Sequence, residues 1–402
     1  MSRTAYAIPL SCLVLALTWV LVQAPTVRAD DDLRDEIRAL NTILGDEDQA
    51  DRVKELAKDP ELARKMLALA KKMADDQPDR FNFSGAIILA NLSQELQDWD
   101  VGDKFYRIAV DRAKVQNNSR RIVITYLTWV DLLTEAKRFE AAEKTCQEIL
   151  ELDGDDDGSL IPIGKAYALR SLVRLAAIQG KVKDAFRKLE RVNDEIPFHA
   201  ETKAWLLQFT GKYDDAEEIY LRLYQRLDPD DERLESEREK FARILGSMYG
   251  DMGDVDKATK MLRPLLLKKP DDAGLNNDLG YIWADLKHNV DEAAAMIKKA
   301  VDAEPDNSSF LDSYGWALFR QGKLEEARDF LKRATAKPRG QNIEILDHYA
   351  EVLWALGERD EAKAIWKKAV EVATPAHRDQ QRKQAIERRL GSGGESKDGP
   401  AR

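Results

Sequence analysis

The sequence contains little cysteine. Of its 402 residues only two are cysteine, Cys12 and Cys146. Cys12 lies inside an apolar N-terminal run, so removal of that run would leave Cys146 alone and the chain without an internal disulfide. Stability must then come from packing. Cys146 falls on an inward helical position and is expected to be a small buried hydrophobic residue.

Histidine is also scarce, which excludes most catalytic and metal centres. The chain has four histidines. None of them stands in an HExxH pattern, and no two have the spacing of a metal pair on one helix. The sequence has no GxSxG, Walker or GxGxxG motif. We therefore predict a protein without enzymatic activity and without a cofactor.

Positive charge is not in excess. Lys and Arg number 63 against 73 Asp and Glu, and the formal net charge is −10. Such a chain repels nucleic acid, so no nucleic-acid partner is predicted. One basic stretch, RDQQRKQAIERR (378–389), is short and interleaved with acids and glutamine. We interpret it as part of a charged capping helix over 377–390.

The first residues predict export. An apolar run from Ala7 to Val22 follows Arg3, and Val27-Arg28-Ala29 places small residues just before an acidic start. This is the layout of a secretory signal peptide, with cleavage expected after Ala29. A secreted, periplasmic or envelope location follows, without membrane insertion of the cleaved chain. The run is shorter than the ~20 residues of a spanning helix, and a retained anchor is the alternative.

A short phrase recurs along the chain: a small or flexible residue, a charged one, a bulky one, two polar residues, then alanine. The last three steps between copies are 35, 34 and 35 residues, and a period near 34 is typical of a helical repeat. The longer steps coincide with acidic insertions at 153–160 and 228–237. The copies end at Gly102, Ala142, Ala185, Ala216, Ala258, Ala293, Ala327 and Ala362.

Each phrase lies between two helical patterns. In the clearest copy these are helix A over 310–321 and helix B over 325–336. Gly315 and Ala327 are small enough for the two helices to approach closely, and Gly322 turns the chain between them. A proline after helix B commonly stops it.

These patterns resemble the tetratricopeptide repeat (TPR), as in bacterial secreted and envelope TPR proteins. The resemblance implies an all-α, TPR-type α-solenoid: a right-handed superhelix of antiparallel helix pairs, with about 7–9 repeats. The residues that carry it best are Leu245, Gly246, Tyr249, Ala258 and Pro270, then Leu279, Gly280, Trp283, Ala293, Ala300 and Pro305, then Tyr349, Ala350, Leu353, Ala362, Trp366 and Ala369.

The predicted organisation follows from where the repeats are regular. Its parts are a signal peptide (1–29), N-terminal helices that begin the stack (30–80), divergent repeats with acidic insertions (81–238), well-formed repeats (239–376), the capping helix (377–390) and a disordered tail (391–402).

The resemblance also implies a binding face, because helix A of each TPR lines the concave groove. Carried onto this sequence, the partner-binding positions are Asn277, Tyr281, Trp316, Phe319, Arg320, Glu351 and Trp354, with Asp285, Asp312 and Asp347 beside them. Exposed aromatics flanked by charge are typical anchors for a partner chain. The alternative is that Trp316 and Trp354 fill space between repeats. Because the face is mainly acidic, a basic or apolar peptide or helix suits it.

One loop has a calcium-like pattern. Asp153, Asp155 and Asp157 alternate before Gly158, as in the first half of an EF-hand loop. The closing ligand should be a glutamate, but that position is Gly164. We therefore favour an acidic turn between repeats and predict no metal site.

These observations predict a non-enzymatic protein–protein interaction scaffold of the cell envelope that binds a partner peptide or helix in the concave groove. Two alternatives stay open: a recruiting or regulatory subunit of an envelope enzyme complex, and a Ca²⁺-modulated surface component. The sequence determines neither the partner nor the oligomeric state.

Overall fold

A computed structural model describes residues 58–154, 160–191 and 198–392. Every regular element in these ranges is a helix, and no strand occurs among them. The predicted all-α solenoid of helix pairs is therefore confirmed. The predicted signal peptide, the first part of the predicted N-terminal helices (30–57) and the tail beyond 392 lie outside the described residues. None of the described helices combines the length and apolar character that a membrane span requires.

The chain divides into two compact units, residues 1–175 with 195–198, and residues 176–194 with 199–402. The division falls inside α8. The predicted domain boundaries were drawn from repeat regularity, a different property, and stay predictions. The helices up to the division are α3 (Pro60–Asp76), α4 (Phe83–Glu95), α5 (Trp99–Val115), α6 (Ser119–Glu135), α7 (Phe139–Leu150) and most of α8 (Ile161–Ile178).

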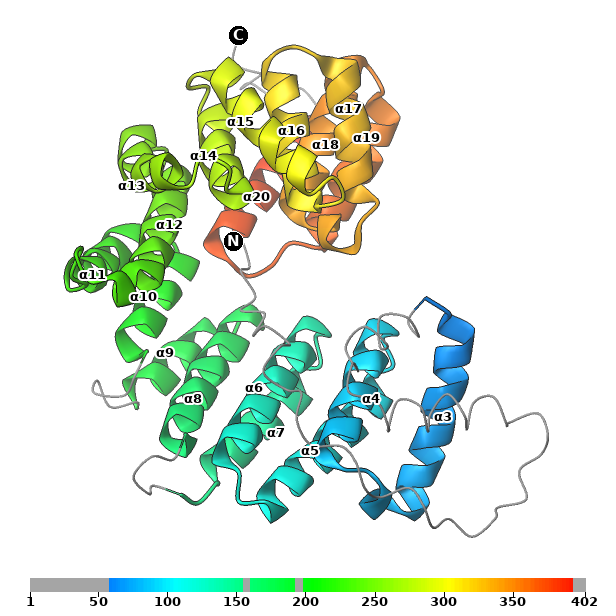
Figure 1. Cartoon of the computed structure of the whole chain (residues 1–402). Helices are drawn as coiled ribbons and strands as arrows, with labels where there is room; N and C mark the ends of the chain where they lie inside the picture. Colours follow the sequence, from blue (N-terminus) through cyan, green and yellow to red (C-terminus); the bar gives the residue numbers. More distant parts are fainter. Residues whose placement is uncertain (1–57, 155–159, 192–197, 393–402) are drawn as a thin grey trace. The chain divides into compact units, whose positions relative to one another are not determined.

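The second unit holds the remaining helices, which appear in Figure 1 from green to red. They are α9 (Val182–Glu190), α10 (His199–Phe209), α11 (Tyr213–Gln225), α12 (Glu235–Asp251), α13 (Val255–Lys268), α14 (Ala273–Asp285), α15 (Val290–Ala303), α16 (Ser308–Arg320), α17 (Leu324–Thr335), α18 (Ile343–Leu356), α19 (Arg359–Glu371) and α20 (His377–Gly391).

Consecutive helices pack as pairs. Among the described residues, seven such pairs lie within one unit or the other: α4/α5, α6/α7, α10/α11, α12/α13, α14/α15, α16/α17 and α18/α19. The first helix of each pair from α12 onward also packs on the first helix of the next, as α12/α14, α14/α16 and α16/α18. These first helices are helix A of the predicted repeat, and the second helices are helix B.

The pair α16/α17 shows how the local sequence builds a repeat. The Asn307 side chain accepts a hydrogen bond from the Ser309 amide at 3.0 Å and caps α16. Gly322 has φ +79° in the turn to α17. A Cβ at Gly315 would lie 2.6 Å from Leu331 Cγ, so only glycine permits this approach. The predicted roles of both glycines are confirmed.

Helix A is buried more deeply than helix B. In α16, ten of 13 residues are buried, whereas in α17 three of 12 are. The reason is that each helix A lies between its own helix B and the next repeat, while helix B turns one side to solvent.

The first unit is held by aromatic side chains and by small residues. The Trp129 ring stacks at 6.0 Å from Tyr106, and its Nε1 donates a hydrogen bond to Asp103 at 2.8 Å. Cys146 is fully buried on α7, as predicted, and burial raises the pKa of its thiol to about 12. The thiol therefore stays protonated and unreactive at neutral pH.

The close approach at Gly315 makes a testable prediction. Replacing Gly315 with alanine should lower the free energy of unfolding by about 1–3 kcal/mol through overpacking, although alanine is the better helix former. The control is Gly391→Ala, because a Cβ there meets no atom within 4 Å. Thermal melts followed by far-UV circular dichroism compare the two. A melting temperature for Gly315→Ala at or above that of the unchanged protein would contradict the packing argument.

Candidate protein-binding site

The candidate site lies on the A helices of the second unit, on the side that faces away from helix B. We call this side the free edge, and α20 packs on it. Figure 1 draws α20 in red, and it lies beside α18. It packs on α18 and α19, and its start also reaches α10. The charged helix that the sequence predicted at 377–390 therefore exists, but it does more than cover the last repeat.

Three arginines of α20 hold the three carboxylates of α18. Arg382 pairs with Asp347 at 3.1 Å and with Glu344 at 3.1 Å. Arg389 pairs with Asp347 at 2.9 Å and with Glu351 at 2.7 Å. The third arginine also pairs with Glu344, as the next paragraph describes. Since α18 has no Lys or Arg of its own, its free edge is purely acidic and α20 supplies the neutralising charge.

The N-terminal end of α20 connects distant repeats. Arg378 pairs with Glu344 of α18 and, at 3.3 Å, with Asp251 at the end of α12. The His377 ring lies against Gly211 in the α10–α11 turn, where a Cβ would come within 2.5 Å of the ring. The side chains at one end of α20 thus touch repeats that are far apart in the sequence.

The arginines change the titration of the acids they meet. Burial would raise the pKa of Glu344, but the guanidinium groups of Arg378 and Arg382 outweigh it and hold this pKa well below its usual range. Burial raises the pKa of Asp251, and burial together with Asp347 raises that of Glu351, in each case against the pull of an arginine. The charged forms of these carboxyls therefore depend on the arginines beside them.

The two predicted aromatics of α16 are not exposed anchors. Trp316 is 4% exposed and Phe319 is 8% exposed. The Trp316 ring stacks on His348 at 4.0 Å, and its Nε1 donates to Asp285 at 2.9 Å. The expectation that they present an exposed surface is corrected: the stacking ring and the adjacent helices cover them. Their role in partner binding stays a prediction.

His348 and Asp312 support this stack from inside. Nδ1 of His348 lies 2.9 Å from Asp312 Oδ1, and both side chains are buried. Burial would lower the pKa of His348, but the carboxylate of Asp312 outweighs it and the pKa is raised. The pair therefore belongs to the packed interior between α16 and α18.

Asn277 and Arg320 are held inside the repeats, and Trp354 points toward α19. Asn277 is buried on α14. Arg320 lies over the Trp316 ring at 4.4 Å and donates to the backbone oxygen of Asp285 at 3.2 Å. Trp354 rests on Trp366 of α19, with ring centroids 5.5 Å apart. It therefore packs on the helix B of its own repeat.

Tyr281 and Glu351 lie beside the carboxylate and the arginine that join α18 to α20. The Tyr281 hydroxyl donates a hydrogen bond to Glu344 at 2.5 Å. Glu351 pairs with Arg389 as described above. Of the seven predicted positions, Glu351 pairs directly with α20 and Tyr281 bonds to Glu344, which pairs with α20. The sequence prediction missed Glu344 and Asp251. A signal for them existed: the α18 acids stand at i, i+3 and i+7, and the α20 arginines at i, i+4 and i+11.

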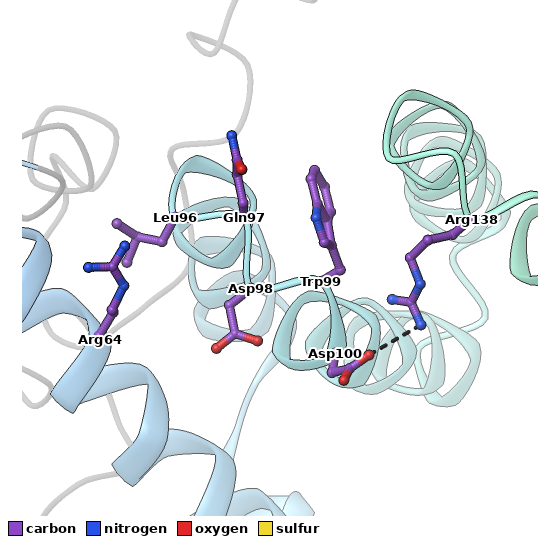
Figure 2. A pocket seen from close by; sticks show the side chains of 7 residues that line it. All are labelled: Arg64, Leu96, Gln97, Asp98, Trp99, Asp100 and Arg138. Atoms are coloured by element: carbon purple, nitrogen blue, oxygen red, sulfur yellow. Dashed lines mark ion pairs between the residues drawn. The ribbon is translucent and has the colours of Figure 1, made fainter. Parts of the chain in front are cut away.

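The first unit has a separate hollow of about 430 Å³ beside the α4–α5 turn (Figure 2). Trp99 stands beside it, and Arg138 pairs with Asp100 across one side at 3.2 Å. Its lining side chains are Arg64, Leu96, Gln97, Asp98, Trp99, Asp100 and Arg138. No residue of the predicted groove contributes to it.

The calcium-like loop is described only in part, since 155–159 lie outside the described residues. Within the described ranges, no group of three or more His, Cys, Asp or Glu side chains could hold a metal ion. Asp153 is the only one of the three acids that the structure describes.

Comparison with known proteins supports the repeat assignment. The tetratricopeptide-repeat family matches two segments, residues 287–341 and 346–368. A TPR repeat-containing protein of Pseudomonas aeruginosa is 32% identical over 159 residues, which are 39% of this chain and 26% of that protein. The chain thus matches about a quarter of the length of this curated relative.

Solved structures show similar arrangements. A TPR protein of Thermus thermophilus is 22% identical, with 46% of this chain and 91% of that chain covered and a TM-score of 0.37. A tetratricopeptide repeat protein of Parabacteroides merdae is 13% identical, with 66% and 98% covered and a TM-score of 0.46. The recurring phrase, the helix pairs and the two matched segments together show that the chain contains tetratricopeptide repeats.

Proposed function

We propose that this chain is a non-enzymatic interaction scaffold of the cell envelope, which binds a peptide or helix of a partner protein on the free edge of its A helices. Tetratricopeptide repeats are generally non-enzymatic and serve protein–protein interaction, which supports the coarser part of the proposal. The acidic character of the edge supports a basic ligand.

The observation on which the proposal rests is the set of contacts that α20 makes with the A helices. A stack of helix pairs needs one capping helix at its end, and contacts with α18 and α19 would serve that need. Contacts with Asp251 and the α10–α11 turn go beyond it. The edge of the A helices therefore already accommodates a helix, and accommodation of a helix is what the proposed function requires.

The binding role is proposed for a site centred on Tyr281 and Glu351, with Glu344 and Asp347 between them. These four side chains combine an aromatic hydroxyl with a row of carboxylates. Trp316, Phe319, Arg320 and Asn277 support the site from within the repeats. Trp354 extends it toward α19.

Reversing the acidic edge should abolish partner capture. Glu344→Lys with Glu351→Lys in the tagged full chain is expected to lose the proteins that cross-link to the unchanged protein in cells, because a basic ligand is repelled. The matched control is Glu326→Lys with Asp329→Lys on exposed positions of α17. Circular dichroism verifies helical content in all three. Retention of the same captured proteins by the edge variant would refute the proposed site.

Replacing the buried tryptophan tests a different property. Trp316→Ala should cost about 3–5 kcal/mol of folding stability, since it removes a large buried side chain. Urea unfolding measures this loss. If the variant keeps full stability but loses partner capture, Trp316 contacts the partner directly and the packing role is wrong.

The envelope location rests on the N-terminal run and has its own test. Protein expressed with its leader in a bacterium should be recovered outside the cytoplasm with Asp30 as its first residue, because the peptidase requires small residues before the cut. Replacing Ala29 with phenylalanine should block the cut. N-terminal sequencing that finds Met1 in cytoplasmic protein would contradict the location.

A further inference from the structure

The contact face of α20 is one narrow stripe. Arg378, Arg382, Ile386 and Arg389 are separated by four, four and three residues, so they share one side of the helix. Ile386 is fully buried, and the three arginines hold every carboxylate of α18. The opposite side, with Gln381, Gln384 and Glu387, is exposed. The stripe therefore presents three guanidinium groups and the buried Ile386, with the partly buried Leu390 one turn further along the helix.

Charge holds α20 in place more than apolar burial does. Among its 15 residues Ile386 is the only buried one, whereas α16 buries ten of 13. Five basic and two acidic side chains give α20 a charge of +3. A core helix cannot leave without exposing a large apolar surface. For α20 the main loss is ion pairs, which another helix of the same charge pattern can replace.

The connection to the repeats also permits exchange. Residues 372–376 between α19 and α20 are not helical. No helix B follows α20 within the described residues, so α20 is the one A-like helix of the second unit without such a partner. It is attached to the rest of the fold by one side and one short connection.

We propose that α20 is a built-in competitor for the acidic edge, and that the partner segment is an amphipathic helix that carries arginines at the α20 spacing. This rests on the proposed function and specifies its ligand. The acidic edge is complementary to a basic helix and repels an acidic one. A partner helix binds when it replaces α20 on α18. Because α20 must first leave, the apparent affinity of every partner is lowered, and weakly basic segments do not bind.

The test uses the purified full chain and a fluorescein-labelled peptide of residues 376–391. Arg382→Glu with Arg389→Glu should release α20 and leave α18 unchanged. The control, Lys383→Glu with Arg388→Glu, reverses the same number of charges outside the stripe. Fluorescence anisotropy should show peptide binding at least tenfold tighter to the released variant than to the unchanged protein or the control. A peptide that carries the two Arg→Glu changes should bind none of them.

Each result decides the proposal. Equal peptide affinity for the released variant, the control and the unchanged protein would overturn it, as would no binding to the released variant. If the released variant loses its helical circular dichroism, Arg382→Gln with Arg389→Gln replaces it and the same difference is expected. Light scattering that finds the unchanged protein at twice its mass would mean that α20 seats on a second copy, and would also overturn it. Because the assay needs no cellular partner, its outcome is independent of the capture experiment.

Discussion

The close approach of helix A to helix B at small residues is the constraint on which the second unit depends. At Gly246, Gly280 and Gly315 a Cβ would come within 2.7 Å of a leucine or isoleucine of helix B. Because the two helices touch there, helix A is pressed between neighbouring repeats and its opposite edge stays free. The same contact, made in three consecutive repeats, aligns these free edges in one direction. The side of the A helices on which α20 packs is thus a consequence of where the glycines stand.

The chemistry of the free edges then determines what can cover them. Acids occur there on several A helices, and α18 carries only acids among its charged groups apart from His348. The Asp347 side chain is 4% exposed, so water cannot solvate its charge and a positively charged partner must balance it. Arg382 and Arg389 satisfy it from both sides. The chain is acidic as a whole, yet it keeps a basic helix at its end, and this separation of charge brings the two segments together.

The repeat and its turns could be predicted because they depend on local spacing. Gly315, Ala327 and Gly322 stand at fixed distances within one helix pair. Trp316 could not be assigned, since the groove edge and the packed side of a helix differ by one residue of rotation, or about 100°. The place of Trp354 could not be assigned for the same reason, and its ring packs against Trp366 of α19. The place of α20 could not be predicted either, because Arg378 meets Asp251, which lies several repeats earlier in the sequence, and no local pattern records such a contact.

Arginine is better suited than lysine to pair with the carboxylates of α18. Arg382 reaches Glu344 and Asp347, three residues apart, and Arg389 reaches Asp347 and Glu351, four residues apart. A planar guanidinium with donors on several sides can span two carboxylates on successive turns, whereas an ammonium acts as a single point of charge. Two such bridges that share Asp347 form a continuous ladder along α18. The ladder requires both the i, i+3, i+7 acids of α18 and the guanidinium geometry of the two arginines.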